Sequence, residues 1–369
     1  MRYDLDRNRF FGYDDEVLSF DAEEVQQSFS IITGLLLFEN INTNDLNIDY
    51  KGTLNAYNLT DNFEANEFGI DFDFGIDKAL TENIKADLGL SVETFSFNQS
   101  ESQSLTKAMI SPSVTLNGEI YTLKVGVEAF TADKTRLVPD LEASVQVSGE
   151  KAVLFAKWYE DAPFISYDYI RQINPFVNTD QHIEYGYQEK RQIGIKGGIN
   201  NVQYELSAYQ APLEDLLLFV TDSLNPTRFN TLYDDGSMIN VHASSTITPN
   251  NRSKVVLGVD VNNYMLDTQQ EAWSLPQVEA SLGGQFAATE KLNILGEIFI
   301  GNGVYHRQLD GSSVQLNSLF DLNLGAEYIF NEKVGFFLDV NNILNNERAR
   351  YVNYPNVGIN FLGGVTFRL

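Results

Sequence analysis

The sequence predicts an all-β fold, namely a transmembrane antiparallel up-and-down β-barrel with about 16–18 visible strands. Three observations predict it. Apolar and polar residues alternate along most of the chain, the alternating segments are long, and short turns close every second junction between them. Successive side chains of a strand point to opposite faces, so each alternating segment has one apolar and one polar face.

The segment from Leu319 to Ile343 shows the repeating unit most clearly. Its two alternating halves are separated by the polar turn Asn331-Glu332-Lys333. The apolar positions are Phe320, Leu322, Leu324, Ala326, Tyr328 and Phe330 before the turn, and Val334, Phe336, Leu338 and Val340 after it. The pattern predicts a β-hairpin with one apolar and one polar face.

The same unit recurs from residue 28 to the end of the chain, and most of the predicted strands have 11 to 15 residues. Strands of soluble proteins cluster near five or six residues, whereas a tilted strand that crosses a bilayer needs about nine to eleven. The predicted strands are 28–39, 45–59, 66–76, 84–98, 105–117, 119–131, 138–148, 151–160, 184–197, 201–211, 237–248, 254–267, 274–288, 291–303, 319–330, 333–345 and 358–369.

The connections between these strands fall into two classes. Short polar turns close every second junction, as at Asn117-Gly118-Glu119 and Thr289-Glu290-Lys291. The other junctions include long loops at 161–183, 212–236, 304–318 and 346–357. Short turns on one side and long loops on the other are typical of outer-membrane barrels, with turns in the periplasm and loops outside the cell.

The strand count gives an expectation for the start of the chain. Bacterial single-chain barrels have an even number of strands with both ends in the periplasm. Counting back from Leu369, strand 28–39 runs toward the periplasm, so one more strand is expected before it. We expect residues 1–27 to be an extracellular loop or the end of a missing strand, with Tyr3 to Tyr13 as the end of that strand and the loop that follows it. Residues 1–369 are then one barrel domain without a plug domain. Either this barrel is N-terminally incomplete, or the predicted strand count is wrong by one.

Composition excludes several classes of protein. With 43% hydrophobic residues, the chain contains no run near the roughly 18 apolar residues of a spanning helix, and its densest apolar segment is Ile31 to Phe38. Cysteine is absent, which excludes disulfides and thiolate metal sites. The net charge of −26 disfavours nucleic acid as a partner, and a solvated acidic surface explains it more simply than a specific acidic site.

The alternation by itself does not show which face meets lipid. The polar face carries charges in mid-strand, which suits either a wet barrel interior or a solvent-exposed surface. These residues are Asp71, Asp73, Asp87, Glu128, Asp260, Glu297 and Asp339. Strand length and loop asymmetry favour the membrane, because backbone groups in lipid must be paired internally and a closed barrel has no sheet edges.

Several short segments resemble a known family. Residues Phe337 to Asn346 resemble the penultimate-strand signature of TonB-dependent receptors, and Gly358 to Val365 resemble their final strand. Further segments similar to strands of this family are Asn174-Pro175-Phe176 with Glu184 to Tyr187, Leu206 to Gln210 with Asp215-Leu216, and Arg9 to Tyr13. The resemblance implies the barrel portion of a Bacteroidetes-type receptor. It departs from the family in two ways: no plug or TonB box precedes the strands, and the last residue is Leu369 where an aromatic residue is usual.

Candidate chemical sites are few. None of His182, His242 and His306 lies in a metal-ligand spacing, and no Gly-x-Ser-x-Gly motif is present. Asp71, Asp73 and Asp77 resemble the start of a calcium loop, but they fall within strand alternation and no glutamate follows at the twelfth position. We therefore expect no cofactor, no metal and no enzymatic activity, with a hydrolase that uses His242 as a remote alternative.

The long connection after residue 157 is the richest in aromatic residues. Its weak candidates for ligand binding are Trp158, Tyr159, Tyr167, Tyr169 and Arg171. Aromatic residues at strand ends usually lie at the membrane–water interface and form the interfacial girdle. Two interpretations of these residues therefore stay open: they belong to this girdle, or they bind a ligand at the entrance of the barrel.

The leading prediction is an outer-membrane protein, surrounded by lipid, that takes up or passes a small ligand. The alternative is a plugless structural or interaction subunit that binds other envelope proteins. The sequence names neither the ligand nor the partner proteins.

Overall fold

The computed structural model describes residues 2–9, 25–41, 47–346, 351–352 and 357–367. Two features named above lie outside the described residues, namely Phe10 to Tyr13 of a family-like segment and the terminal Leu369. Within the described part, no helix is long and apolar enough to cross a membrane.

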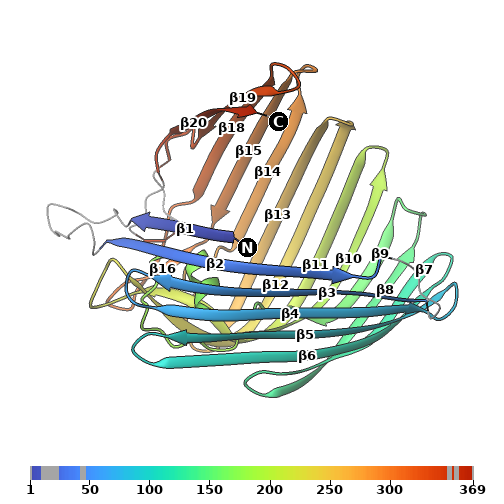
Figure 1. The fold of residues 1–369 in the computed structure, drawn as a ribbon, viewed down its shortest axis with the longest axis horizontal. Helices are drawn as coiled ribbons and strands as arrows, with labels where there is room; N and C mark the ends of the chain where they lie inside the picture. Colours follow the sequence, from blue (N-terminus) through green and yellow to red (C-terminus); the bar gives the residue numbers. More distant parts are fainter. Residues whose placement is uncertain (1, 10–24, 42–46, 347–350, 353–356, 368–369) are drawn as a thin grey trace. The chain divides into compact units, whose positions relative to one another are not determined.

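The secondary structure is almost entirely strand (Figure 1). Among the described residues, eighteen strands form one sheet, and two short strands form a separate hairpin. The strands of the large sheet are β1 (Arg2–Arg9), β2 (Gln26–Glu39), β3 (Ile48–Asp61), β4 (Asn66–Ala79), β5 (Ile84–Asn98), β6 (Ser102–Asn117), β7 (Tyr121–Thr131), β8 (Thr135–Gln146), β9 (Val153–Glu160), β10 (Tyr187–Ile199), β11 (Val202–Thr221), β12 (Phe229–Asn250), β13 (Ser253–Leu266), β14 (Val278–Ala287), β15 (Leu292–Asn302), β18 (Leu319–Ile329), β19 (Val334–Asn341) and β20 (Asn360–Phe367). The small hairpin is β16 (Tyr305–Arg307) with β17 (Ser313–Gln315), and the single helix of the described part is α1 (Tyr167–Ile173).

The pairing of strands follows the chain. From β1 to β8 each strand pairs antiparallel with the next, and β13, β14, β15, β18, β19 and β20 do the same. This is an up-and-down meander, so the predicted strand topology is confirmed.

Contacts divide the chain into two compact units. The first comprises Met1–Gln146, Phe155–Gln192 and Gln210–Ser237, and the second comprises Val147–Leu154, Ile193–Tyr209 and Met238–Leu369. In the second unit, the predicted hairpin at 319–343 is present as β18 and β19. Its apolar face is exposed, with Phe336 at 45% and Leu338 at 52% relative accessibility, as expected of side chains that meet lipid.

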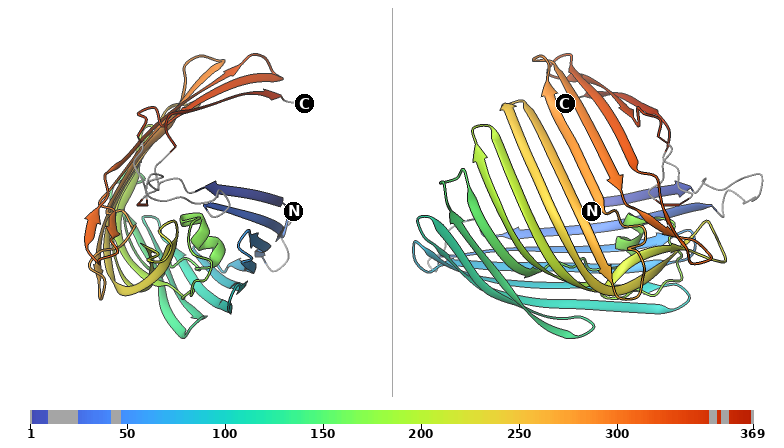
Figure 2. Two further views of the ribbon diagram at one scale, coloured as in Figure 1. Left: turned by 90° about the vertical axis from the view of Figure 1, so that its left-hand side faces the viewer. Right: turned by 180° about the vertical axis from the view of Figure 1, so that it is seen from behind.

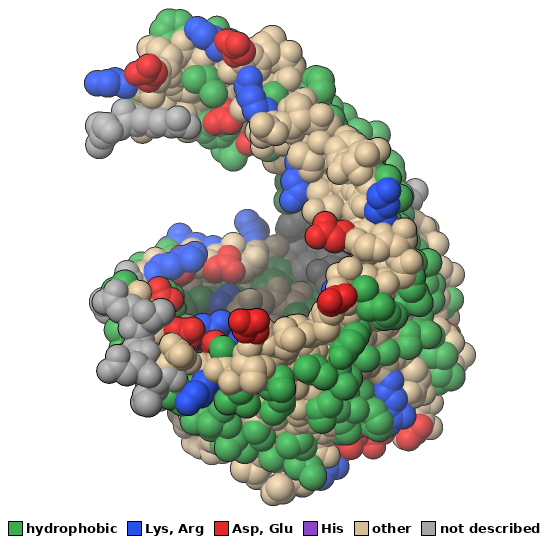
Figure 3. Space-filling model, turned by 90° about the vertical axis from the view of Figure 1, so that its right-hand side faces the viewer, with side chains coloured by type: hydrophobic (Ala, Val, Ile, Leu, Met, Phe, Trp, Pro, Cys, Tyr) green, Lys and Arg blue, Asp and Glu red, His purple; other side chains and the backbone are tan. Residues whose placement is uncertain are grey.

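In the first unit, the two faces of the sheet differ in the same way. Phe68, Ile110 and Leu137 are among its exposed large apolar side chains. Figure 3 shows broad areas of hydrophobic side chains on one face of the strands, whereas charged side chains lie mostly on the other face and at strand ends. The other face of β2 to β5 is covered at one end by α1 and its flanking segments (Figure 2).

The structure corrects five details of the prediction. Residues Arg2–Arg9 are a strand that pairs with β2, so this part of the segment expected as a loop or strand end is the eighteenth strand. Strands β11 and β12 are longer than predicted, so most of the expected loop 212–236 is strand. Alternation fails there because neighbouring residues Leu217, Leu218 and Phe219 are all buried, which hides the period of two.

The other three corrections concern loops. The expected loop 161–183 contains α1, and the expected loop 304–318 contains the hairpin of β16 and β17. Loop lengths are also less strictly segregated than predicted. On the side of the long loops, the connections 62–65, 99–101 and 132–134 are as short as the turns at the opposite end.

Candidate functional site: a loop anchored on the polar face

Segment 161–186 folds back against the polar face of the first unit. On β4, Glu67 shares its face with Asp71 and Asp73, whereas Phe68 and Ile70 point to the other side. Because α1 contacts Glu67, it lies on the polar face. In a membrane barrel the apolar face meets lipid, so the polar face lines the interior.

Helix α1 is short and has defined ends. Ser166 is its N-cap residue, and its Oγ accepts a hydrogen bond of 3.1 Å from the Tyr169 N–H. Asp168 lies in the first turn and Arg171 in the last, where each charge suits the helix dipole. The helix ends at Ile173, just before the Asn174-Pro175 pair, because proline disfavours helical geometry in the residue before it.

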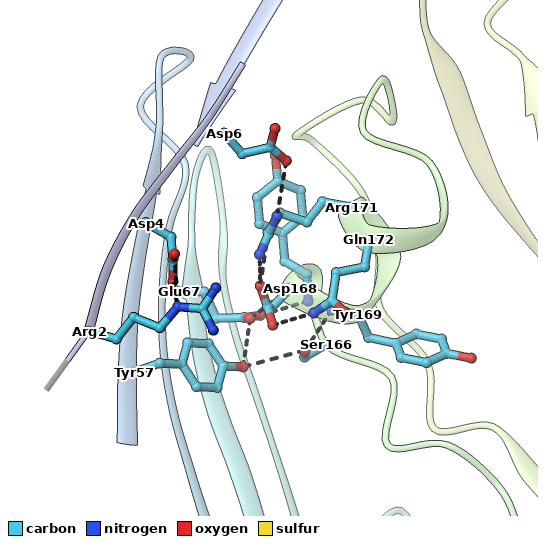
Figure 4. Close-up of polar contacts among 11 residues, drawn as sticks. Arg2, Asp4, Asp6, Tyr57, Glu67, Ser166, Asp168, Tyr169, Arg171 and Gln172 are labelled. Atoms are coloured by element: carbon cyan, nitrogen blue, oxygen red, sulfur yellow. Dashed lines mark hydrogen bonds and ion pairs between the residues drawn. The ribbon is translucent and has the colours of Figure 1, made fainter. Parts of the chain in front are cut away.

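The carboxylate of Glu67 holds the start of this helix (Figure 4). It accepts hydrogen bonds from the backbone N–H of Tyr167 at 2.7 Å and of Asp168 at 2.9 Å. The Tyr57 hydroxyl donates a third bond of 2.9 Å to Glu67. Three donors converge on the Glu67 side chain, which is 0% exposed, and its oxygens satisfy two N–H groups that the helix leaves unpaired.

Tyr167 forms a second attachment beside Glu67. Its hydroxyl donates a 2.8 Å hydrogen bond to Asp61, and its ring lies 4.8 Å from that of Phe97 and 6.3 Å from that of Phe29, centroid to centroid. Burial and the neighbouring Asp61 charge raise the pKa of Tyr167 well above its usual value. Tyr167 is 1% exposed and therefore acts as a buried anchor.

The next turn of α1 is held by charge. Arg171 Nε donates to Asp168 at 2.8 Å, and its guanidinium stands 5.0 Å above the ring of Phe29. Asp6 of β1 lies 3.7 Å from Arg171. Tyr169 differs from these residues because its ring points away from the anchored cluster (Figure 4). Burial raises the pKa of the Tyr169 hydroxyl.

The far end of the segment is fastened by a separate cluster. Tyr185 and Tyr187 pack with Phe130 in one buried group, and the Arg136 guanidinium lies 4.6 Å from the Tyr187 ring. Burial raises the pKa of Tyr185. Beside them, the buried Lys107 ammonium lies 5.0 Å from the Phe130 ring.

That ammonium is paired with a buried carboxylate. Lys107 Nζ lies 3.0 Å from Glu160 Oε2 and 3.1 Å from Oε1. The Glu160 N–H in turn donates to Glu128 on β7 at 3.0 Å. Such a pair holds the end of β9 against β6 and β7, at the point where segment 161–186 begins.

The structure separates the five candidate ligand residues into three settings. Tyr167 and Arg171 are enclosed in the anchor, and Tyr169 projects from it. Trp158 and Tyr159 lie on β9, where Trp158 Nε1 donates to Glu189 at 2.6 Å and Arg191 covers its ring at 5.0 Å. A ligand-binding role for any of them stays a prediction. Sequence reasoning missed Glu67, because it occupies an ordinary polar position in the alternation of β4.

His182 lies within segment 161–186, 2.9 Å from Glu184, whereas His242, His306 and the calcium-like aspartates lie outside it. In the second unit, His242 Nδ1 lies 2.9 Å from Asp260, and the Asn240 amide donates to the same carboxylate at 3.2 Å. Asp71 accepts a bond from Asn55, and Asp77 lies 3.3 Å from Lys85. The described residues contain no group of three His, Asp or Glu side chains placed to hold a metal.

No family model matches the sequence, and no curated protein matches it. Solved structures do match. The FrpB iron transporter from Neisseria meningitidis has a TM-score of 0.69 at 11% identity, over 99% of this chain and 68% of that chain. The chain has the barrel fold of TonB-dependent outer-membrane receptors. The predicted fold class is therefore confirmed, and the predicted outer-membrane location is that of these structural neighbours.

Two further receptors illustrate the likeness. The ferric-catecholate import receptor Fiu from Escherichia coli K12 has a TM-score of 0.66 at 10% identity, over 93% of this chain and 64% of that chain. The pyoverdine receptor FpvA from Pseudomonas aeruginosa has a TM-score of 0.64 at 11% identity, over 93% of this chain and 62% of that chain. This chain thus spans about two thirds of the length of the three proteins. Identities this low establish the shared fold alone.

Proposed function

We propose that this chain is the barrel of an outer-membrane receptor that binds a small ligand and passes it across the membrane. The observation that carries the proposal is the two-faced, eighteen-stranded sheet with an ordered loop held on its polar face. An apolar exterior suits lipid, and loops at the mouth of a barrel are where its ligands are met. In this proposal residues 1–369 form a single barrel domain.

The ligand class is open, and the structural neighbours supply the first probes. Their names identify a ferric-catecholate receptor, a pyoverdine receptor and a copper transporter. A test would add ferric catecholate, ferric pyoverdine and Cu²⁺ separately to the purified protein and follow the fluorescence of Trp158 and Trp273. Saturable quenching by one probe, followed by its uptake into proteoliposomes, is the expected result.

The competing function is a structural or interaction subunit of an envelope complex. The anchored loop is compatible with it, because a fixed loop also presents a stable surface to a protein partner. A barrel that binds none of the probes, gives no conductance in planar bilayers and co-purifies with stoichiometric envelope proteins would overturn the receptor proposal in favour of this alternative.

A further inference from the structure

The loop covers a limited stretch of the polar face, and burial marks its edge. Along the inward-facing positions of β4, Glu67 and Gly69 are buried, Asp71 is half-buried and Asp73 is exposed. Asp71 lies four positions after Glu67, which corresponds to about 13 Å along a strand. The segment therefore covers the outer end of the interior wall and leaves the wall below it open.

The segment is fixed along its whole length. Its first part forms hydrogen bonds to Glu67 and Asp61, as described above. Its middle forms a bridge with β12, in which Phe229 donates to Phe176 at 3.1 Å and Asn178 donates to Phe229 at 2.7 Å. Its last part joins β6, where the Gln103 side chain accepts from the Ile183 N–H at 2.9 Å.

These attachments distinguish the segment from an ordinary surface loop. Surface loops usually expose their backbone to water, whereas here side chains of β4 and β6 satisfy backbone N–H groups of the loop. Moving the segment away would remove two of the three donors to Glu67, the backbone N–H groups of Tyr167 and Asp168, and would leave only the Tyr57 hydroxyl, which is unfavourable. The arrangement thus resists displacement by a passing solute.

We propose that segment 161–186 is a fixed constriction at the mouth of the barrel, held by Glu67, which limits the size of solutes that reach the wall below it. This inference rests on the proposed transport function for its physiological meaning. The constriction itself is a property of the loop and can be measured without any ligand.

The first experiment measures access to the covered wall. The chain has no cysteine, so Asp71→Cys supplies a single thiol at the edge of the covered region. Its labelling rate with a polymer-linked maleimide is compared in three backgrounds: otherwise unchanged, Glu67→Gln, and Gln172→Ala. Gln172 is exposed and donates to Asp168 at 2.7 Å on the outer side of the helix, so it serves as the matched control.

Glu67→Gln replaces an acceptor of three bonds by an amide whose N–H₂ group faces donors. We expect labelling to accelerate by about tenfold or more with Glu67→Gln and to stay within about twofold with Gln172→Ala. With a small maleimide, the labelling rates in the three backgrounds should differ less than with the polymer-linked maleimide. Equal rates in all three backgrounds would overturn the constriction. If Glu67→Gln fails the heat-modifiable gel shift that reports folding, Tyr57→Phe removes one donor to Glu67 while it keeps the ring, and the same comparison applies.

The second experiment separates the two proposals. Swelling of liposomes that contain each variant is measured with neutral sugars from a pentose to a tetrasaccharide. A constriction predicts that Glu67→Gln raises the rate most for the largest sugar. Faster labelling without swelling or uptake in any variant would refute the transport function and leave the constriction intact. Swelling that is equal for every sugar in all variants would refute the constriction and leave transport intact.

Discussion

Replacing Gly69 by alanine should loosen the anchor without touching the loop. Gly69 is the cross-strand partner of Tyr57, and the Tyr57 ring lies over it. A Cβ at Gly69 would lie 2.3 Å from Cε1 and Cζ of Tyr57 and 2.5 Å from its hydroxyl oxygen. Non-bonded carbons are comfortable at about 3.5 Å, so the ring must move by about 1 Å.

The cost follows from two ways to accommodate the methyl group. If Tyr57 stays, the overpacked contact costs about 1–3 kcal/mol. If Tyr57 moves, its hydrogen bond to the Glu67 carboxylate is lost, which costs about 1.5–3 kcal/mol. The protein adopts the cheaper response, so we expect Gly69→Ala to lower the free energy of unfolding by about 1–3 kcal/mol.

A matched control lies on the same strand and the same face. At Gly75 an added Cβ would meet the Lys51 side chain at 4.0 Å, which is an ordinary contact. Gly75→Ala should be neutral or stabilise by about 0.5–1 kcal/mol, because alanine loses less backbone entropy on folding. The measurement is urea unfolding of the refolded barrel in lipid vesicles, followed by the heat-modifiable gel shift.

The double variant makes the test specific. In a Tyr57→Ala background the ring is gone, so Gly69→Ala should cost no more than Gly75→Ala does. The coupling between positions 57 and 69 should therefore equal most of the single-variant cost. Equal stability of Gly69→Ala and Gly75→Ala, or a coupling near zero, would refute the argument that Tyr57 is held between its glycine partner and the anchor.

Three further outcomes are expected. Tyr167→Phe keeps the aromatic packing but removes the hydrogen bond from the loop to Asp61, which keeps its bonds from Gln27 and from the Phe63 and Ala65 N–H groups, so protease cleavage within the loop should accelerate while the folded fraction stays unchanged. Lys107→Met leaves a buried carboxylate unpaired and should lower the free energy of unfolding by about 3–5 kcal/mol, and a smaller loss than that of Gly69→Ala would contradict the pairing. Partial burial favours a higher pKa for Asp133, but hydrogen bonds from Arg136 and the next backbone N–H outweigh it and lower the pKa. A lowered carboxyl pKa stabilises the fold above about pH 4 and not below, so Asp133→Asn should reduce stability at pH 7 and match the unchanged protein near pH 2 in thermal unfolding.

The alternation of residues determined the larger part of this fold. A strand has a period of two, so Phe320 to Phe330 and Val334 to Val340 specified their own faces and their turn. Strand length distinguished a membrane barrel from a soluble sheet. The same rule failed at Leu217 to Phe219, where both faces are covered and the pattern no longer alternates.

The anchored loop was decided by tertiary structure alone. The sequence marked 161–183 as long and aromatic, and it placed Tyr167, Tyr169 and Arg171 there as possible ligand contacts. Whether those side chains face a ligand or the wall depends on Glu67, which lies 100 residues from Tyr167 in the chain. A glutamate in an alternating strand looks the same whether it meets water or a helix, because local sequence encodes the face of a side chain and not its distant partner. Only the folded chain brings that carboxylate to the backbone of α1.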